Sequence, residues 1–304
     1  MPLSLQVFIA MFVIGALLRS SGILTKRHAE HVATFVFSVS LPATILVSLD
    51  QVVLVPTAWK LPLAACFITI PMVLCSWQLA RFLRLPRASQ GGFVLVTGSI
   101  NSVYFAFPVT LATFGEQGLS HAVLFDLGQT TLTLTVLYGL AVWHGAHVTT
   151  PRSAAVRFLS SPPLWALICI LLVKLSGHQL FPWLLEGLWP LHLTTTPLAS
   201  MVLGLSISFS TIQRAAPLAI VGVVVRMGGG LILGFSSAWL LGLAGVERAV
   251  VILVAAMPSA VSAVISAAET HLDEELVAST VALSVCVGMV MLPWLPLLAS
   301  VLLD

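Results

Sequence analysis

The sequence predicts an all-α membrane protein with ten transmembrane helices, and two observations lead to this prediction. Of the 304 residues, 59% are hydrophobic and only 8% are charged, whereas a soluble domain carries about 25% charged residues. The apolar residues also form long runs, and a helix of roughly 20 such residues crosses the hydrocarbon of a bilayer. These runs lack the apolar–polar alternation of a membrane β-barrel, so helices are the expected spanning elements.

The apolar runs define the expected spans in order along the chain. Ten spans begin near Leu3, Val32, Ala58, Gly91, Leu119, Pro162, Pro190, Pro217, Ala249 and Glu275. Basic residues concentrate in cytoplasmic loops of membrane proteins. With the N-terminus outside, the inner loops collect Arg19, Lys26, Arg27, Arg81, Arg84, Arg87, Arg152, Arg157 and Arg214, against Lys60, Lys174 and Arg248 outside. Both termini are therefore expected on the outer side.

The two halves of the chain resemble each other around matched prolines. "SLPATILVSL" around Pro42 resembles "TTPLASMVLGLSIS" around Pro197, and "FAFPVT" around Pro108 resembles "AAMPSAV" around Pro258. Five spans is an odd number, so a second set of five enters the membrane from the opposite side. We expect two inverted five-helix repeats, residues 1–145 and 162–304, joined by a cytoplasmic loop at 146–161.

Prolines at mid-depth in the fourth and ninth spans indicate where a polar site lies. A proline removes one helical hydrogen bond, and unpaired backbone inside a membrane is tolerated where it lines a cavity or is buried in protein. We expect both helices to break and cross, with half-helices beginning near Pro108 and Pro258 whose positive ends attract an anion. Asn101 lies about two turns before the first break. The alternative, that the prolines only kink packed helices, stays open.

Ionisable and amide side chains in other spans are further candidates. Arg226 lies near mid-membrane in the eighth span, where a charge costs at least about 2.5 kcal/mol on insertion scales. It either pairs with Asp126 of the fifth span or contacts the substrate. Gln129 shares a helix face with Asp126, so both are candidates for coupling or helix pairing. The expected substrate-binding residues are Asn101, Tyr104, Pro108, Met257, Pro258, Ser259 and Arg226, although packing alone would also explain Tyr104.

Four segments carry a resemblance to a known family. They are "SINSVYFAFPVTLATFGEQG", "HAVLFDLGQT", "VVVRMGGG" and "VILVAAMPSAVSAVISAAETHLDEELVASTVALSV". In this order they resemble the auxin efflux carrier family, which includes plant PIN-type auxin transporters and bacterial malate and malonate permeases. The resemblance implies a scaffold subdomain, a mobile subdomain around two crossed helices, and an organic anion at the crossing. It matches Asn101 to the family's substrate-contacting asparagine, and Pro108 and Pro258 to its crossing prolines.

The resemblance has two departures. The long hydrophilic loop of many plant members is absent, and the third predicted span has Lys60 near its outer end without a convincing acidic residue. A proton-coupling role placed in that span in relatives is therefore not expected to transfer.

The expected function is secondary transport of a small organic anion, a carboxylate, by alternating access at the crossing of spans 4 and 9. A non-transporting receptor, a sensor or a channel on the same fold is the alternative, followed by an intramembrane enzyme, for which no nucleophile–base pair can be named. The protein is expected to be a non-enzyme of the plasma membrane, the inner membrane in a bacterium. Its expected partners are the substrate and the lipid bilayer, with a coupling ion (proton or sodium) and a homodimer left open. No cofactor or metal is expected. No nucleic acid is expected either, because the net charge of +2 is too small for a nucleic-acid face.

Overall fold

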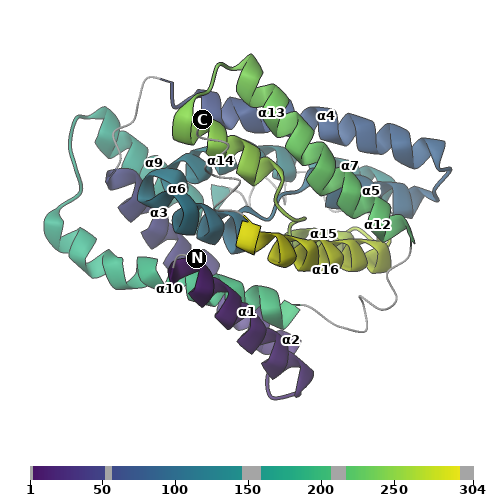
Figure 1. Ribbon diagram of the computed structural model, residues 1–304, viewed down its shortest axis with the longest axis horizontal. Coiled ribbons are helices and arrows are strands. Elements are labelled where there is room, and N and C mark those ends of the chain that lie inside the picture. The colour runs from purple at the N-terminus through teal and green to yellow at the C-terminus, as the bar shows by residue number, and fades with distance from the viewer. Residues whose placement is uncertain (1–2, 52–56, 146–158, 207–216, 295–304) are drawn as a thin grey trace.

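The computed structural model describes residues 3–51, 57–145, 159–206 and 217–294 (Figure 1). These residues form helices joined by short turns, and the described ranges contain no strand beyond one isolated backbone bridge. Six helical stretches are long and apolar enough to cross a membrane: Leu3–Ser20, Arg27–Asp50, Lys60–Phe82, Ser102–His144, Pro217–Leu240 and Glu274–Trp294. The prediction of an all-α membrane protein is confirmed.

The helices of the first half follow the predicted apolar runs. They are α1 (Leu3–Ser20), α2 (Lys26–Phe35), α3 (Leu41–Asp50), α4 (Lys60–Phe82), α5 (Arg87–Gly98), α6 (Phe107–Leu132) and α7 (Tyr138–His144). Three π-helical stretches, Val36–Ser40, Ser102–Ala106 and Thr133–Leu137, lead into α3, α6 and α7 without a turn.

The structure describes seven α-helices in the second half of the chain. They are α9 (Pro162–Leu175), α10 (Pro182–Ser206), α12 (Pro217–Val223), α13 (Gly230–Leu240), α14 (Gly245–Ala255), α15 (Ser262–Glu269) and α16 (Glu274–Met291). π-helical turns at Val224–Gly229 connect α12 to α13, and a short 3-10 turn, Leu292–Trp294, follows α16. Prolines begin α9, α10 and α12, because a first helical position needs no N–H donor.

The helices pack in two groups, which we name the scaffold group and the crossing group. The scaffold group consists of α1, α2, α3, α9 and α10, which pack mainly against one another. The crossing group consists of α4 to α7 and α12 to α16. Figure 1 shows α1, α2 and α10 together at the bottom of the view, apart from α4, α12 and α13. The groups meet where α1, α3 and α10 contact α6 and the turns that precede it.

Two glycines allow α1 and α10 to approach closely inside the scaffold group. A Cβ atom on Gly15 would lie 2.5 Å from the carbonyl oxygen of Met201, and one on Gly204 would lie 2.1 Å from the carbonyl oxygen of Phe12. Small residues at a membrane helix interface bring two backbones into contact and increase their van der Waals attraction. The α1–α10 pair therefore depends on both glycines.

Gly204→Ala is expected to lower the thermal unfolding midpoint of the purified protein. The added methyl group would meet backbone atoms of α1, and overpacking of this kind costs about 1–3 kcal/mol. Gly187→Ala on the same helix is the matched control, since its Cβ has no atom within 4 Å. Thermal unfolding in detergent, followed by tryptophan fluorescence, measures both variants. Equal midpoints for the two would contradict the close packing of α1 on α10.

Two interrupted helices cross each other inside the crossing group. Helix α5 ends at Gly98 and the chain becomes helical again at Ser102, while α14 ends at Ala255 and α15 begins at Ser262. The two interruptions pair as an antiparallel bridge between Ile100 and Ser259. The N–H group of Asn101 donates to the carbonyl oxygen of Pro258 at 2.9 Å. The chain therefore breaks and crosses in the two predicted regions.

The position of the first break corrects the sequence prediction for Pro108. The helix begins again at Ser102, and Pro108 lies in the first turn of α6, inside continuous helix. The preceding turns are π-helical, with the N–H group of Phe107 bonded to the carbonyl oxygen of Ser102. Such a wide turn accommodates the proline ring without a break. Pro258, in contrast, lies in the second break, as predicted.

Candidate functional site

The crossing gathers buried polar side chains that have no hydrogen-bond partner within the described residues. Three of these atoms are the hydroxyl oxygens of Ser99 and Ser259 and the amide nitrogen Nδ2 of Asn101, while the hydroxyl of Ser102 interacts with the carboxylate of Asp126. Asn101 is only 2% exposed. A buried unsatisfied donor or acceptor costs about 1–3 kcal/mol, so a cluster of them on two paired breaks is typical of a place where a ligand supplies the partners.

The local backbone explains why these residues face one another. Ser99 is extended (φ −92°, ψ 135°), so the chain leaves α5 as a strand-like segment. The second break is held from α16, where the hydroxyl of Ser284 accepts from the N–H group of Ser259 at 3.1 Å. Met257, 5% exposed, packs in the core beside this break. The structure therefore brings Asn101, Met257, Pro258 and Ser259 together.

Arg226 lies next to the crossing and donates hydrogen bonds to the C-terminal turns of both interrupted helices, α5 and α14. Its guanidinium is fully buried. Nη1 donates to the carbonyl oxygen of Thr97 at 2.9 Å, and Nη2 donates to the carbonyl oxygen of Ala255. These carbonyls belong to the last turns of α5 and α14, where no further helical N–H group is available to them. Arg226 thus caps two helix C-termini at once.

This placement answers the alternatives that the sequence left open for Arg226. An ion pair with Asp126 is absent from the described part of the structure, where the carboxylate of Asp126 accepts from the hydroxyl of Thr130 at 3.0 Å. The side chain of Asp126 instead lines a cavity of about 80 Å³ between α3, α6 and α9. The described residues therefore do not contain the pairing of Arg226 with Asp126, which was one of the two alternatives, and contact of Arg226 with the substrate stays a prediction.

Gln129 also supports the first break. Its amide nitrogen donates to the carbonyl oxygen of Gly98, the last residue of α5, at 3.2 Å, and its amide oxygen accepts from the hydroxyl of Thr69 on α4. Gln129 therefore joins α4, α5 and α6. Tyr104 is half-buried and packs against the main apolar core.

The helix ends give the crossing a net electrostatic preference. Each helix terminus carries about half an elementary charge, positive at the N-terminus and negative at the C-terminus. Two C-termini (α5, α14) and two N-termini (the helix that begins at Ser102, and α15) meet here. The guanidinium offsets the two negative ends, which leaves the two positive ends in excess.

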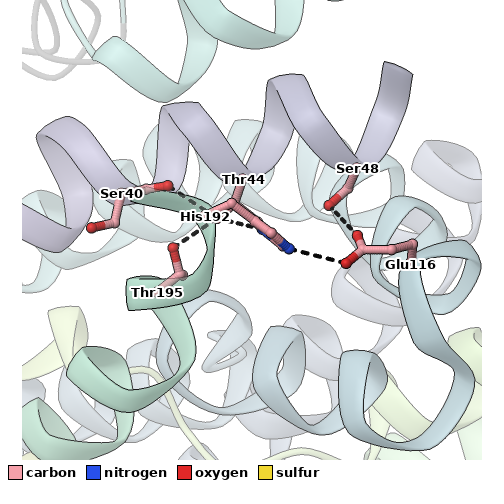
Figure 2. A network of polar contacts seen from close by, with 6 residues as sticks. All are labelled: Ser40, Thr44, Ser48, Glu116, His192 and Thr195. Carbon is pink, nitrogen blue, oxygen red and sulfur yellow. Dashed lines mark hydrogen bonds and ion pairs between the residues drawn. The ribbon is translucent and has the colours of Figure 1, made fainter. Parts of the chain in front are cut away.

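A second polar cluster, absent from the sequence prediction, joins the two helix groups (Figure 2). Nε2 of His192 on α10 lies 3.0 Å from Oε1 of Glu116 on α6, and the hydroxyl of Ser48 on α3 donates to Oε2 of Glu116 at 2.8 Å. The hydroxyl of Thr44 lies 3.3 Å from Nδ1 of His192 and 2.7 Å from the hydroxyl of Thr195. Polar residues recur every four positions through the end of the π-helical stretch and α3, at Ser40, Thr44 and Ser48, and this spacing is the one signal that sequence offers.

Comparison with known proteins places these features in a family. The family described as membrane transport protein matches residues 2–296. An uncharacterized transporter of Methanothermobacter thermautotrophicus is 28% identical over 298 residues, which cover 94% of each chain. An uncharacterized transporter of Methanocaldococcus jannaschii is 26% identical over 284 residues, covering 90% of this chain and 91% of the relative. With six helices able to span a bilayer, this is an integral protein of the plasma membrane, and it belongs to the membrane transport protein family.

Proposed function

We propose that the protein is a secondary transporter that carries a small organic anion of the carboxylate class across the plasma membrane. The observation that carries this proposal is the buried, unpartnered amide of Asn101 between two positive helix ends. Carboxylate oxygens accept from amide and hydroxyl donors, and hydrogen bonds to a charged group are about twice as strong as neutral ones. The amide of Asn101 and the hydroxyls of Ser99 and Ser259 supply such donors.

The proposed topology is ten spans in two inverted repeats, residues 1–145 and 162–304, with both termini outside. Helices lie at all ten predicted positions, and the two interrupted helices occupy corresponding places in the two halves, which supports the repeat. Most of the proposed connecting loop, 146–161, lies outside the described residues. In this proposal the crossing group moves against the scaffold group and exposes the crossing to each side in turn.

Uptake into proteoliposomes tests the proposed function. The purified protein is reconstituted, and labelled malonate, malate and indole-3-acetate are offered as probes. We expect at least one probe to enter faster than into protein-free liposomes and to be exchanged by the same unlabelled anion. Binding of a probe without any entry would instead assign the protein as a receptor on this fold.

Asn101→Ala is expected to raise the dissociation constant of the transported probe on the order of tenfold. A hydrogen bond to a charged group contributes about 1.5–3 kcal/mol, and the substitution removes this donor from the site. Thr131→Ala is the control, because Thr131 lies on the exposed face of α6 and bonds only to its own helix. Titration of the purified protein with the labelled probe measures the affinity. Unchanged affinity in a stably folded Asn101→Ala protein would remove Asn101 from the substrate site.

A further inference from the structure

The contact between Glu116 and His192 joins two groups of helices that otherwise pack mainly within themselves. Glu116 belongs to the crossing group, while His192, Thr44 and Ser48 belong to the scaffold group. The side chain of His192 is 2% exposed and that of Glu116 is 25% exposed. Figure 2 shows His192 between Thr44 and the carboxylate of Glu116. The histidine is therefore held on the scaffold side and meets the carboxylate at the interface.

The hydrogen-bond contacts of this cluster allow the protons on Thr44, Thr195 and His192 to be assigned. The hydroxyl proton of Thr44 goes to the carbonyl oxygen of Ser40 at 3.0 Å, because a carbonyl only accepts. With that assignment the oxygen of Thr44 accepts from its other neighbours, and we assign Nδ1 of His192, at 3.3 Å, as a donor that carries a proton. The hydroxyl of Thr195 is the second donor to Thr44.

With this tautomer, one further proton lies between Nε2 of His192 and Oε1 of Glu116. The two atoms are 3.0 Å apart. A neutral imidazole that is protonated on Nδ1 has a lone pair on Nε2, and an ionised carboxylate only accepts. Two acceptors at hydrogen-bond distance repel each other unless a proton lies between them. The closed pair therefore holds one proton more than a neutral histidine and an ionised glutamate together.

The backbone links this proton to the crossing. The helix that begins at Ser102, beside Asn101, runs to Phe114, and Gly115 then interrupts it with φ 64° and ψ −159°. Glu116 follows at once, so it lies at the far end of the half-helix whose first end is at the crossing. A small cavity of about 10 Å³, lined by His192, Thr44, Pro108 and Leu119 among others, lies between this half-helix and the scaffold group.

Other ionisable groups on the elements around the pair have partners of their own. Asp50 on α3 accepts from the N–H group of Leu180, and Lys174 on α9 donates to the carbonyl oxygen of Asp50. Glu247 on α14 accepts from the hydroxyl of Thr57. The remaining acidic and basic residues on elements packed against α6 or α10 are Arg19 on α1, Lys26, Arg27, His28, Glu30 and His31 on α2, Lys60 and Arg81 on α4, His121 and Asp126 on α6, Glu186 on α10 and Arg248 on α14.

We propose that Glu116 and His192 form the binding site of a coupling proton. Closure of the crossing group on the scaffold group takes up one proton between Nε2 and Oε1. Separation of the two groups returns that proton to water and leaves a neutral imidazole and an ionised carboxylate. This inference rests on the proposed transport function and adds that the driving force is a proton gradient.

The sign of the pH dependence follows from the proton count. In water an imidazole titrates near about pH 6.5 and a glutamate carboxyl near about pH 4.3. Above about pH 7 the separated groups therefore hold no extra proton while the closed pair holds one, so the equilibrium constant for opening rises about tenfold per pH unit. Below about pH 4 the separated groups hold two protons against one, so strong acid also opens the interface.

Cysteine labelling tests the proton count without any substrate. Leu119 lines the cavity beside the pair and is 1% exposed. Leu119→Cys is placed in a protein whose native Cys66, Cys75, Cys169 and Cys286 are replaced. Labelling by N-ethylmaleimide is measured from pH 7 to pH 9 and divided by the rate in unfolded protein at each pH. The expected corrected rate rises about tenfold per pH unit.

Two neutral variants and a control decide the result. Glu116→Gln donates its amide proton to Nε2 and needs no extra proton, so the corrected rate should become independent of pH. His192→Gln should do the same by donating to Glu116. Glu186→Gln, on the exposed part of α10, should keep the slope. A flat profile in the protein that carries only Leu119→Cys, or an unchanged slope in Glu116→Gln, would overturn the proton site.

Transport measurements test whether anion transport is coupled to the proton gradient. They use the anion that the unaltered protein transports. Glu116→Gln should lower accumulation driven by an inward proton gradient at least tenfold more than it lowers counterflow exchange, whereas Glu186→Gln should lower neither. Accumulation that falls only in proportion to exchange would refute the inference and leave the transport function intact. Absence of counterflow in the unaltered protein would instead refute the transport function, and the labelling profile would still decide the proton site.

Discussion

Arg226→Ala is expected to abolish anion uptake, with a loss of at least about a hundredfold. The substitution leaves the carbonyl oxygens of Thr97 and Ala255 buried without their donor, at about 1–3 kcal/mol each. It also removes the charge that offsets two negative helix ends, so that the crossing loses its preference for an anion. Uptake and exchange of the labelled probe, together with the thermal unfolding midpoint, measure both consequences.

Two comparisons show which role of Arg226 matters. Arg226→Lys keeps the charge but lacks the planar fork that reaches two carbonyls, so we expect intermediate uptake and a lowered unfolding midpoint. Because Asp126 is not the partner of Arg226, Asp126→Ala should fail to restore uptake when it is combined with Arg226→Ala. Restored uptake in that double variant, or normal uptake in Arg226→Ala alone, would contradict the capping role.

Gly230→Ala should reduce both the folded yield and uptake, in contrast to Gly228→Ala two residues before it. A Cβ on Gly230 would lie 2.0 Å from the carbonyl oxygen of Ala255 and 2.6 Å from Nη2 of Arg226. The methyl group therefore pushes α13 away from α14 and displaces the guanidinium from the helix end. Overpacking costs about 1–3 kcal/mol, and the lost bond to a charged donor adds about 1.5–3 kcal/mol.

Gly228 provides a control with the opposite expected sign. Its Cβ would meet no atom within 4 Å, and the residue is exposed within π-helical turns. Alanine is a better helix former than glycine by about 1 kcal/mol, so Gly228→Ala should unfold at the same temperature or higher. The unfolding midpoint, the yield of monodisperse protein and uptake are compared for the two variants. A tolerated Gly230→Ala with full uptake would contradict the close contact of α13 with the end of α14.

Local patterns predicted a large part of the fold. Apolar runs of membrane length determine helices because a bilayer leaves no water to pair with the backbone, and helices lie at each of the ten predicted positions. The break at Pro258 was predictable because proline lacks an N–H donor. The break at Ser99–Asn101 was predicted seven residues too late, at Pro108. The π-helical turns that accommodate this proline within the helix have no recognisable sequence pattern, so the sequence could not show that the helix continues through Pro108.

The partners of the polar residues were decided by the tertiary structure alone. Sequence indicated that Arg226 must be compensated, because a lone charge in the membrane is costly, but its partners are backbone carbonyls, which every residue carries and no side-chain pattern reveals. Glu116 and His192 are 76 positions apart and meet only because α6 packs against α3 and α10. Thus hydrophobicity and proline positions, which act locally, determined the helices and the region of the crossing. The capping arginine and the proton-holding pair depend on contacts between distant segments, and only packing of the whole chain creates them.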